Sequence, residues 1–222
     1  MQVNHGSPEY QHGLINGLIL IPEDAEKRIH LRTGQQILRL RLGAHAHCTI
    51  PFAVSVAPGQ ADTGRYSVML NVEGADKELL LCLQEELIRS LKPLRRRVQS
   101  LLLESSVSQQ TGKAYPPRVR CVFDIDHTQV KHVGLDGVTI RDGEFGDIRT
   151  RVSVQADVMV AGLKFICAER RYQCVLKCDT LYLSDKDTTK AGNGFPLFNT
   201  EDSFTLAGAL DLSGGESPFS RH

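Results

Sequence analysis

Tryptophan is absent from this 222-residue sequence, and other aromatic residues are few, with eight Phe and five Tyr. No apolar run approaches the roughly 20 residues that a membrane-spanning helix needs. An excess of either charge is also missing, because 26 basic residues balance 26 acidic ones and the formal net charge is zero. This balance argues mildly against a nucleic-acid-binding protein, since such proteins are often basic overall.

Several catalytic signatures are missing as well. The sequence contains no Gly-x-Ser-x-Gly, no Walker loop and no Rossmann glycine pattern. The acidic, Gly-rich tract 135–147 lacks the ligand spacing of an EF-hand, and we interpret it as a long hairpin turn. We therefore expect a protein that is not an enzyme and uses no cofactor.

The six cysteines lie mostly in apolar segments, and the chain begins with a polar stretch. We therefore expect no secretion signal, buried thiols, and a reducing intracellular compartment such as the cytoplasm or nucleus. Two loose groups could hold a metal, but neither has the paired Cys-x₂-Cys spacing, so loop histidines and buried thiols are the favoured interpretation. The groups are His45, His47 and Cys48, and Cys167, Cys174 and Cys178.

Tracts in which apolar and polar residues alternate are the main feature of the sequence. In residues 37–42 three leucines alternate with two arginines, which predicts a half-buried strand with a basic outer face. A stripe of leucines after Asp76 predicts a helix, and a second helix is expected from Pro93 to Leu103. Further strands are expected at 14–21, 48–57, 66–74, 118–125, 137–141, 148–160, 163–169 and 172–183.

These elements predict a mainly β (α+β) fold, an OB-like barrel with a two-helix insertion. Residues 1–12 are expected to be loose, and residues 13–183 to form the β domain with helices at about 76–103. The Gly/Ser/Thr/Asp-rich residues 184–222 are expected to be a flexible, mildly acidic tail.

Charge is segregated along the chain. Between Arg89 and Arg120 eight basic residues accompany a single acid, Glu104, and the rest of the chain is acidic by the same amount. Such asymmetry indicates a positive surface on one side of the molecule. For the run Arg95–Arg97 alone, a solvated helix face is an equal alternative.

The tract "VFDIDHT" at 122–128 resembles the first motif of haloacid-dehalogenase-type phosphatases. In that family the residue matching Asp124 is the nucleophile, the residue matching Asp126 is an acid/base, and Mg²⁺ lies between them. The family needs alternating helices and strands after the motif, whereas the residues that follow here predict antiparallel strands. We favour a strand that ends in an Asp-rich turn, and phosphatase activity is the third hypothesis.

The order of elements over about residues 66–183 is similar to that of the single-stranded-DNA-binding proteins of large DNA viruses. The strand "YSVMLNV" leads into the helix "DKELLLCLQEELIRSL", and "KAYPPRVRCVFD" and a C-terminal hairpin follow. The resemblance implies an OB-fold core with helical insertions, and a hairpin that carries an aromatic residue. Phe165 stands where a larger aromatic is expected, so the stacking platform is weaker or lies elsewhere.

Single-strand binding requires a cationic groove and aromatic faces for the bases, and an OB barrel offers both. We therefore predict non-catalytic binding of single-stranded nucleic acid, DNA in particular, in replication, recombination or repair. The candidate binding residues are Arg39, Arg41, Arg95, Arg96, Arg97, Lys113, Tyr115, Arg118, Arg120, Arg149, Arg151, Lys164, Phe165, Arg170, Arg171 and Tyr172.

The alternative is a β-sandwich structural or assembly protein of the virion type, which the neutral charge and the few aromatics favour. The tail, with "ESPF" at 216–219, is a candidate site for a protein partner. No membrane partner is expected, and formation of a homo-oligomer is left open. A viral origin would place the protein at a viral replication site.

Overall fold

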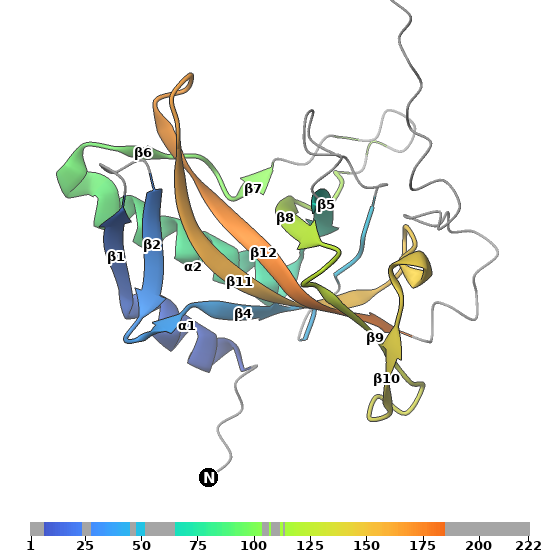
Figure 1. The fold of residues 1–222 in the computed structure, drawn as a ribbon. Helices are drawn as coiled ribbons and strands as arrows, with labels where there is room; N and C mark the ends of the chain where they lie inside the picture. The colour runs from blue at the N-terminus through green and yellow to red at the C-terminus, as the bar shows by residue number, and fades with distance from the viewer. Residues whose placement is uncertain are drawn as a thin grey trace, which may run out of the picture.

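The computed structural model describes residues 7–23, 28–44, 48–51, 65–103, 107, 112 and 114–184. These residues form one 12-stranded sheet with two α-helices (Figure 1). The helical elements are α1 (Pro8–Asn16), α2 (Gly74–Leu91) and the 3₁₀ turns η2 (Lys92–Leu94) and η3 (Phe145–Asp147). The strands are β1 (Leu18–Glu23), β2 (Arg28–Thr33), β3 (Gln36–Ile37), β4 (Arg39–Leu42), β5 (Arg65–Asn71), β6 (Arg97–Val98), β7 (Leu102–Leu103), β8 (Arg118–Asp124), β9 (Gln129–Val133), β10 (Ile140–Gly143), β11 (Val154–Ile166) and β12 (Arg171–Ser184).

The centre of the sheet is the long antiparallel ribbon of β11 and β12. The order of paired strands along the sheet is β1-β2-β11-β12-β8-β5. On the same edge of β11, β2 pairs with residues 163–164 and β4 pairs with residues 156–159. On its other edge β12 pairs in parallel with β6, β8 and β9 in turn. Alternate residues of both long strands are buried, which is the pattern of strands with one face on the core.

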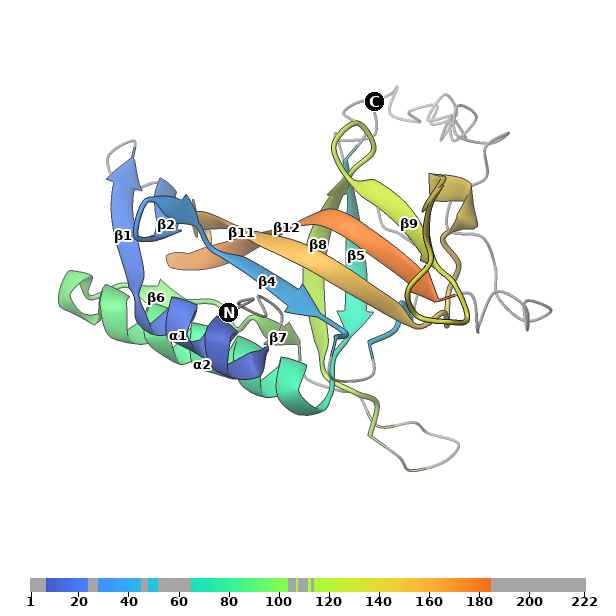
Figure 2. The same cartoon turned by 90° about the horizontal axis from the view of Figure 1, so that it is seen from below.

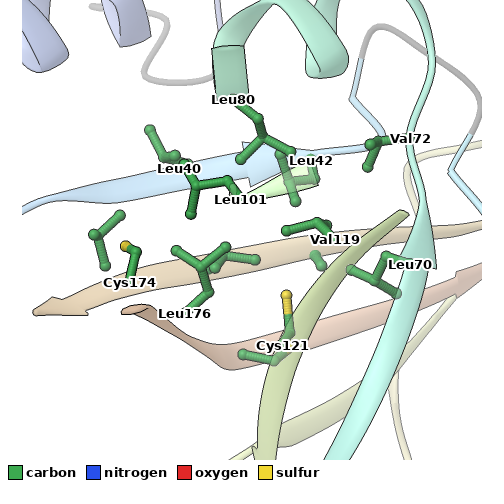
Figure 3. Close-up of a cluster of buried hydrophobic side chains, with 14 of the residues drawn as sticks. Leu40, Leu42, Leu70, Val72, Leu80, Leu101, Val119, Cys121, Cys174 and Leu176 are labelled. Carbon is green, nitrogen blue, oxygen red and sulfur yellow. The ribbon is translucent and has the colours of Figure 1, made fainter. Parts of the chain in front are cut away.

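The core lies between the sheet and α2. The leucine stripe of α2 is buried against the sheet, and Figure 3 shows Leu80 beside Leu40 and Leu42 of β4 and Leu101. Figure 2 shows that α1 and α2 lie together on one side of the β11–β12 ribbon. The opposite face of the sheet is therefore the one that is free of helices in the described part of the chain.

The predicted barrel is not closed. The main path has two ends, β1 and β5, and no pairing between described residues joins them. The mainly β class is confirmed, and so is the alternation in 37–42, where the three leucines are at most 2% exposed. That tract forms two short strands, β3 and β4, which meet at Leu38.

The second helix predicted from Pro93 to Leu103 is wrong. The chain makes only the turn η2, passes through Arg95 in the left-handed region (φ 52°), and then continues as the short strands β6 and β7. Neighbouring elements satisfy the backbone there: the Gln99 N–H donates to the carbonyl of Tyr172 (2.7 Å), and the Leu101 N–H donates to Gln84 Oε1 (2.8 Å). Hydrogen bonds to β12 and α2 therefore replace those of a helix.

The expectation of a loose segment at 1–12 is corrected for its described part, because α1 begins at Pro8. Ser7 caps the helix, since its side chain accepts a hydrogen bond from the Tyr10 N–H, and Pro8 is favourable in the first turn. Gln11 is buried and accepts a hydrogen bond from the Arg41 N–H (2.7 Å), which ties α1 to β4. Residues 1–6 and the predicted tail from 185 onward lie outside the described residues.

Candidate nucleic-acid interface

A cavity of about 810 Å³ opens at the place where β8 diverges from β12. These two strands pair only at Lys177 opposite Val122. The lining comes from β2, β11, β12, β8 and β5, which are successive strands of the sheet path, and from residues 99–103 between β6 and β7. In Figure 1 these strands are the β11–β12 ribbon with β2 on one side and the β8–β5 pair on the other.

Each of the five strands contributes one cationic side chain to this lining. Arg28 lies opposite Lys164 in the register, and Lys177 lies opposite Val122, two residues from Arg120 on β8. No Asp or Glu is present among the described residues that line the cavity. We call these five residues the cation stripe: Arg28 of β2, Lys164 of β11, Lys177 of β12, Arg120 of β8 and Arg65 of β5.

The cation stripe is not neutralised by neighbouring carboxylates, with one exception. The Arg65 Nε donates to Asp124 Oδ2 (3.1 Å), and Asp124 also contacts His127 Nδ1 (3.0 Å). The hydrogen bonds from His127 and Arg65 hold the pKa of the Asp124 carboxyl below its usual range, against the opposing effect of burial. The other four cations form no ion pair with another described residue.

Two features shape the floor of the cavity. At Gly162 (φ 140°) a Cβ atom would lie 2.5 Å from the carbonyl oxygen of Ile29, so β2 and β11 approach closely only because this residue is glycine. Ser67 of β5 also lines the cavity, and its buried Oγ has no hydrogen-bond partner among the described residues.

Two of the residues predicted from the sequence, Arg120 and Lys164, lie in the cation stripe. Arg118 is two residues from Arg120 on the same face of β8, but it is partly buried and does not line the cavity. Sequence reasoning missed Arg28, Arg65 and Lys177. The sequence signal that could have found Lys177 is the apolar residue at every second position of 172–178, which places Lys177 on the outer face.

Three other predicted arginines bind carboxylates within the protein. Arg41 of β4 makes a two-pronged pair with Asp157 of β11, with Nε–Oδ1 at 2.6 Å and Nη2–Oδ2 at 2.8 Å. Arg39 pairs with Asp179, and Arg171 pairs with Glu169. In this structure these three side chains are held by carboxylates and lie outside the lining of the cavity.

The tip of the β11–β12 ribbon carries the predicted aromatic site. The rings of Phe165 and Tyr172 are 5.2 Å apart and tilted by 58°, and the Arg96 guanidinium lies 5.3 Å from the Phe165 ring centre. Tyr172 is only 1% exposed, so its ring belongs to the core, and the prediction that it stacks with bases is corrected. Phe165 is half-buried, with the Arg96 guanidinium over its ring and Tyr172 beside it.

The remaining predicted residues do not line the cavity. Arg95 and Arg97 are exposed beside η2 and β6, Arg170 (φ 50°) is in the turn at the ribbon tip, and Tyr115 is 52% exposed before β8. Arg149 and Arg151, which precede β11, do not line the cavity either. Lys113 lies outside the described residues.

The phosphatase-like tract occupies the turn between β8 and β9. Asp124 ends β8, and the Thr128 hydroxyl accepts from the Asp124 N–H (3.0 Å) and donates to the carbonyl of Cys178 (2.8 Å). The chain then enters β9, and both β8 and β9 run parallel to β12. The motif therefore stands in a break between two strands and is not followed by a helix.

The cysteine groups are spread over different surroundings. Cys174 and Cys178 are buried on the core face of β12, whereas Cys167 is exposed at the ribbon tip. Burial raises the pKa of the Cys121 and Cys174 thiols to about 12. Within the described ranges no three His, Cys, Asp or Glu side chains gather as a metal site would require, and His45 and His47 lie outside those ranges.

No protein-family model matches the chain, and no curated protein matches it significantly. The two helices that the structure describes are both too short or too polar to cross a membrane.

Proposed function

We propose that this protein binds single-stranded nucleic acid, without catalysis, along the cation stripe. The observation that carries the proposal is the placement of one cation on each of five successive strands, around a cavity whose described lining contains no carboxylate. Phosphate groups supply the negative charge that this surface lacks, and contacts to phosphates dominate the affinity of nucleic-acid binders.

A flexible single strand suits this surface better than a duplex does. The site is a concave hollow on a sheet, whereas duplex readers insert a projecting helix or ribbon into a groove. Between the cations lie small apolar side chains such as Val122 and Val175, which can contact base faces. Aromatic groups are few, so we expect phosphate contacts to give most of the affinity and sequence preference to be slight.

We also propose that the fold is OB-like and related to that of the viral single-stranded-DNA-binding proteins. What supports this is a mainly β fold with a helix between β5 and the strands that follow it, and a long C-terminal ribbon whose tip carries Phe165. The open path of the sheet distinguishes the fold from a closed barrel.

The proposal is tested by fluorescence anisotropy with labelled oligo-dT over a series of salt concentrations. The double change Arg120→Ala and Lys164→Ala removes two charges from the cation stripe. For single strands each lost phosphate contact reduces the slope of log K against log salt by about 0.7, so the double variant should lose about 1.4. The control, Lys77→Ala with Lys92→Ala, removes two exposed charges from α2 and η2. Equal slopes for the two double variants would overturn the proposal.

A structural or assembly role is the second candidate, because apolar side chains are exposed on β1, on β3 and on the β9–β10 hairpin. Such a role requires self-association or partner binding without nucleic acid. If oligo-dT fails to bind at low salt while the protein associates with itself, the assembly role replaces the first proposal.

A further inference from the structure

The sheet has a gap on one edge of β12. On this edge β6 pairs with Arg171 and Tyr172, and the next pairing is that of β8 with Lys177. The four residues between them, 173–176, pair with no described residue on this edge, although β11 pairs with all four on the other edge. All four line the cavity, so the gap opens into it.

Backbone groups of Cys174 and Leu176 point into this gap. The Tyr172 carbonyl accepts a hydrogen bond on this edge from the Gln99 N–H (2.7 Å), and the Cys178 carbonyl accepts one there from a hydroxyl of the β8–β9 turn (2.8 Å). Every second residue of a strand directs its N–H and C=O groups to the same edge, and the register with β11 omits no residue of β12 from 171 to 178. Cys174 therefore presents an N–H donor and a C=O acceptor that no described strand pairs, and the N–H of Leu176 points the same way.

Apolar and amide side chains surround the gap. Val175 of β12 and Val122 of β8 are half-buried on its two sides, and the side chains of Gln99 and Gln173 also line the cavity. A nucleobase combines faces that contact apolar side chains with an edge that donates and accepts hydrogen bonds. The gap therefore offers both kinds of contact that a base requires.

A peptide strand fits the gap less well than a base does. Strands usually have about five or six residues, whereas only four residues of this edge are open between β6 and β8. The described lining of the cavity also contains no Asp or Glu. Lys177 lies opposite Val122 in the register, and Arg120 lies on the same face of β8, so both cations are beside the gap where the phosphates that flank a base would bind.

We propose that one base of the bound single strand enters this gap. The backbone of Cys174 and Leu176 binds the edge of the base, and Val122 and Val175 contact its faces. This inference rests on the proposed function and adds to it that a base, and not the phosphates alone, contributes to affinity. The edges of all four bases carry hydrogen-bonding groups, so the contact is compatible with a slight sequence preference.

The test compares two labelled strands of equal length and charge by fluorescence anisotropy: oligo-dT, and a strand in which abasic sugars replace every nucleoside. The double change Val122→Met and Val175→Met extends two side chains into the gap without changing any charge. It should weaken binding of oligo-dT about tenfold, the effect of one or two hydrogen bonds, and leave binding of the abasic strand unchanged. The control, Leu81→Met with Ile88→Met, alters exposed apolar residues of α2 and should bind both strands like the wild type.

A second measurement uses the wild-type protein and so does not depend on how the variant folds. Oligo-dT that contains 4-thiothymidine is irradiated in the complex, and mass spectrometry identifies the cross-linked peptides. The cross-links should include residues 173–177 of β12 or 119–122 of β8, which lie on the two sides of the gap.

Equal losses of affinity for the two strands, or no loss for either, would overturn the inference, and so would cross-links confined to other parts of the chain. The proposed function would survive these results, because the salt slope of the variant with Arg120→Ala and Lys164→Ala reports phosphate contacts. Failure of the wild type to bind either strand at low salt would overturn the proposed function, and the inference with it.

Discussion

Lys164 of β11 lies directly opposite Arg28 of β2 in the antiparallel register, and both side chains line the cavity. Like charges in directly opposed positions destabilise a pair of strands. Neither forms an ion pair with a described side chain, and Glu23 of β1 is the register partner of Arg28 on its other side. A bound phosphate would relieve the like-charge contact between Lys164 and Arg28.

Replacing Lys164 with Gln should therefore raise stability while it weakens binding. The gain is about 0.2–1 kcal/mol at low ionic strength, or up to about 4 °C in melting temperature for a chain of this size. Screening by salt should reduce the gain. Thermal melts at two salt concentrations measure it, with Lys77→Gln on α2 as the control. A variant no more stable than the wild type at low salt would show that the two charges do not repel.

Gly162→Ala should destabilise the protein by about 1–3 kcal/mol. The change places a side chain in a backbone conformation that L residues rarely adopt, with its Cβ 2.5 Å from the Ile29 carbonyl oxygen. Gly13→Ala is the matched control, because Gly13 is inside α1 with open space around its Cβ position, and it should gain about 0.5–1 kcal/mol. Urea unfolding of both variants measures the difference. Equal effects would contradict the close approach of β2 and β11.

Arg41→Ala should cost stability and leave affinity for oligo-dT almost unchanged. The Arg41 guanidinium is held by Asp157, and Asp157 also accepts a hydrogen bond from the Tyr182 hydroxyl (3.1 Å). Loss of this partly exposed, two-pronged pair should cost about 1–2 kcal/mol. Unfolding and anisotropy measurements on the same preparation separate the two effects. A large loss of affinity at unchanged stability would show instead that Arg41 contacts the nucleic acid.

Thr139→Val should raise the pKa of Asp136 from about 2 towards the ordinary 3.8, since the Thr139 hydroxyl is the largest cause of the shift. The native carboxyl has the lower pKa, so its contribution to stability is present above about pH 4 and disappears as the pH falls towards 2. An NMR titration of the aspartate carboxyl carbons measures the shift, and the other aspartates serve as internal controls. An unchanged Asp136 titration would show that the hydroxyl contributes nothing.

Much of the sheet could be predicted because the relevant signal is local. The alternation of leucine and arginine in 37–42 and the leucine stripe of α2 depend only on which residues face the core. The prediction of a helix from Pro93 to Leu103 was wrong because the interactions that decide this segment are not local. Its apolar spacing fits a helix, but hydrogen bonds to Gln84 and Tyr172, which no local pattern reveals, hold the chain extended.

The site was harder to predict than the sheet. Sequence spacing shows that Arg39 and Arg41 point outward, but not that Asp179 and Asp157, more than 100 residues away, neutralise them. Conversely, only the strand order brings Arg28 opposite Lys164 and places Lys177 in the lining of the same cavity. Whether an outward cation is free depends on its neighbours across the sheet.

The most direct test of the cation stripe is the reactivity of lysine side chains in the wild-type protein. Acetylation followed by mass spectrometry compares the modification rates of individual lysines with and without oligo-dT. Lys164 and Lys177 line the cavity, whereas Lys77 and Lys92 are exposed on α2 and η2. The account requires that oligo-dT slows modification of the first two and leaves the last two unchanged. Equal rates at Lys164 and Lys177 with and without saturating oligo-dT would contradict it.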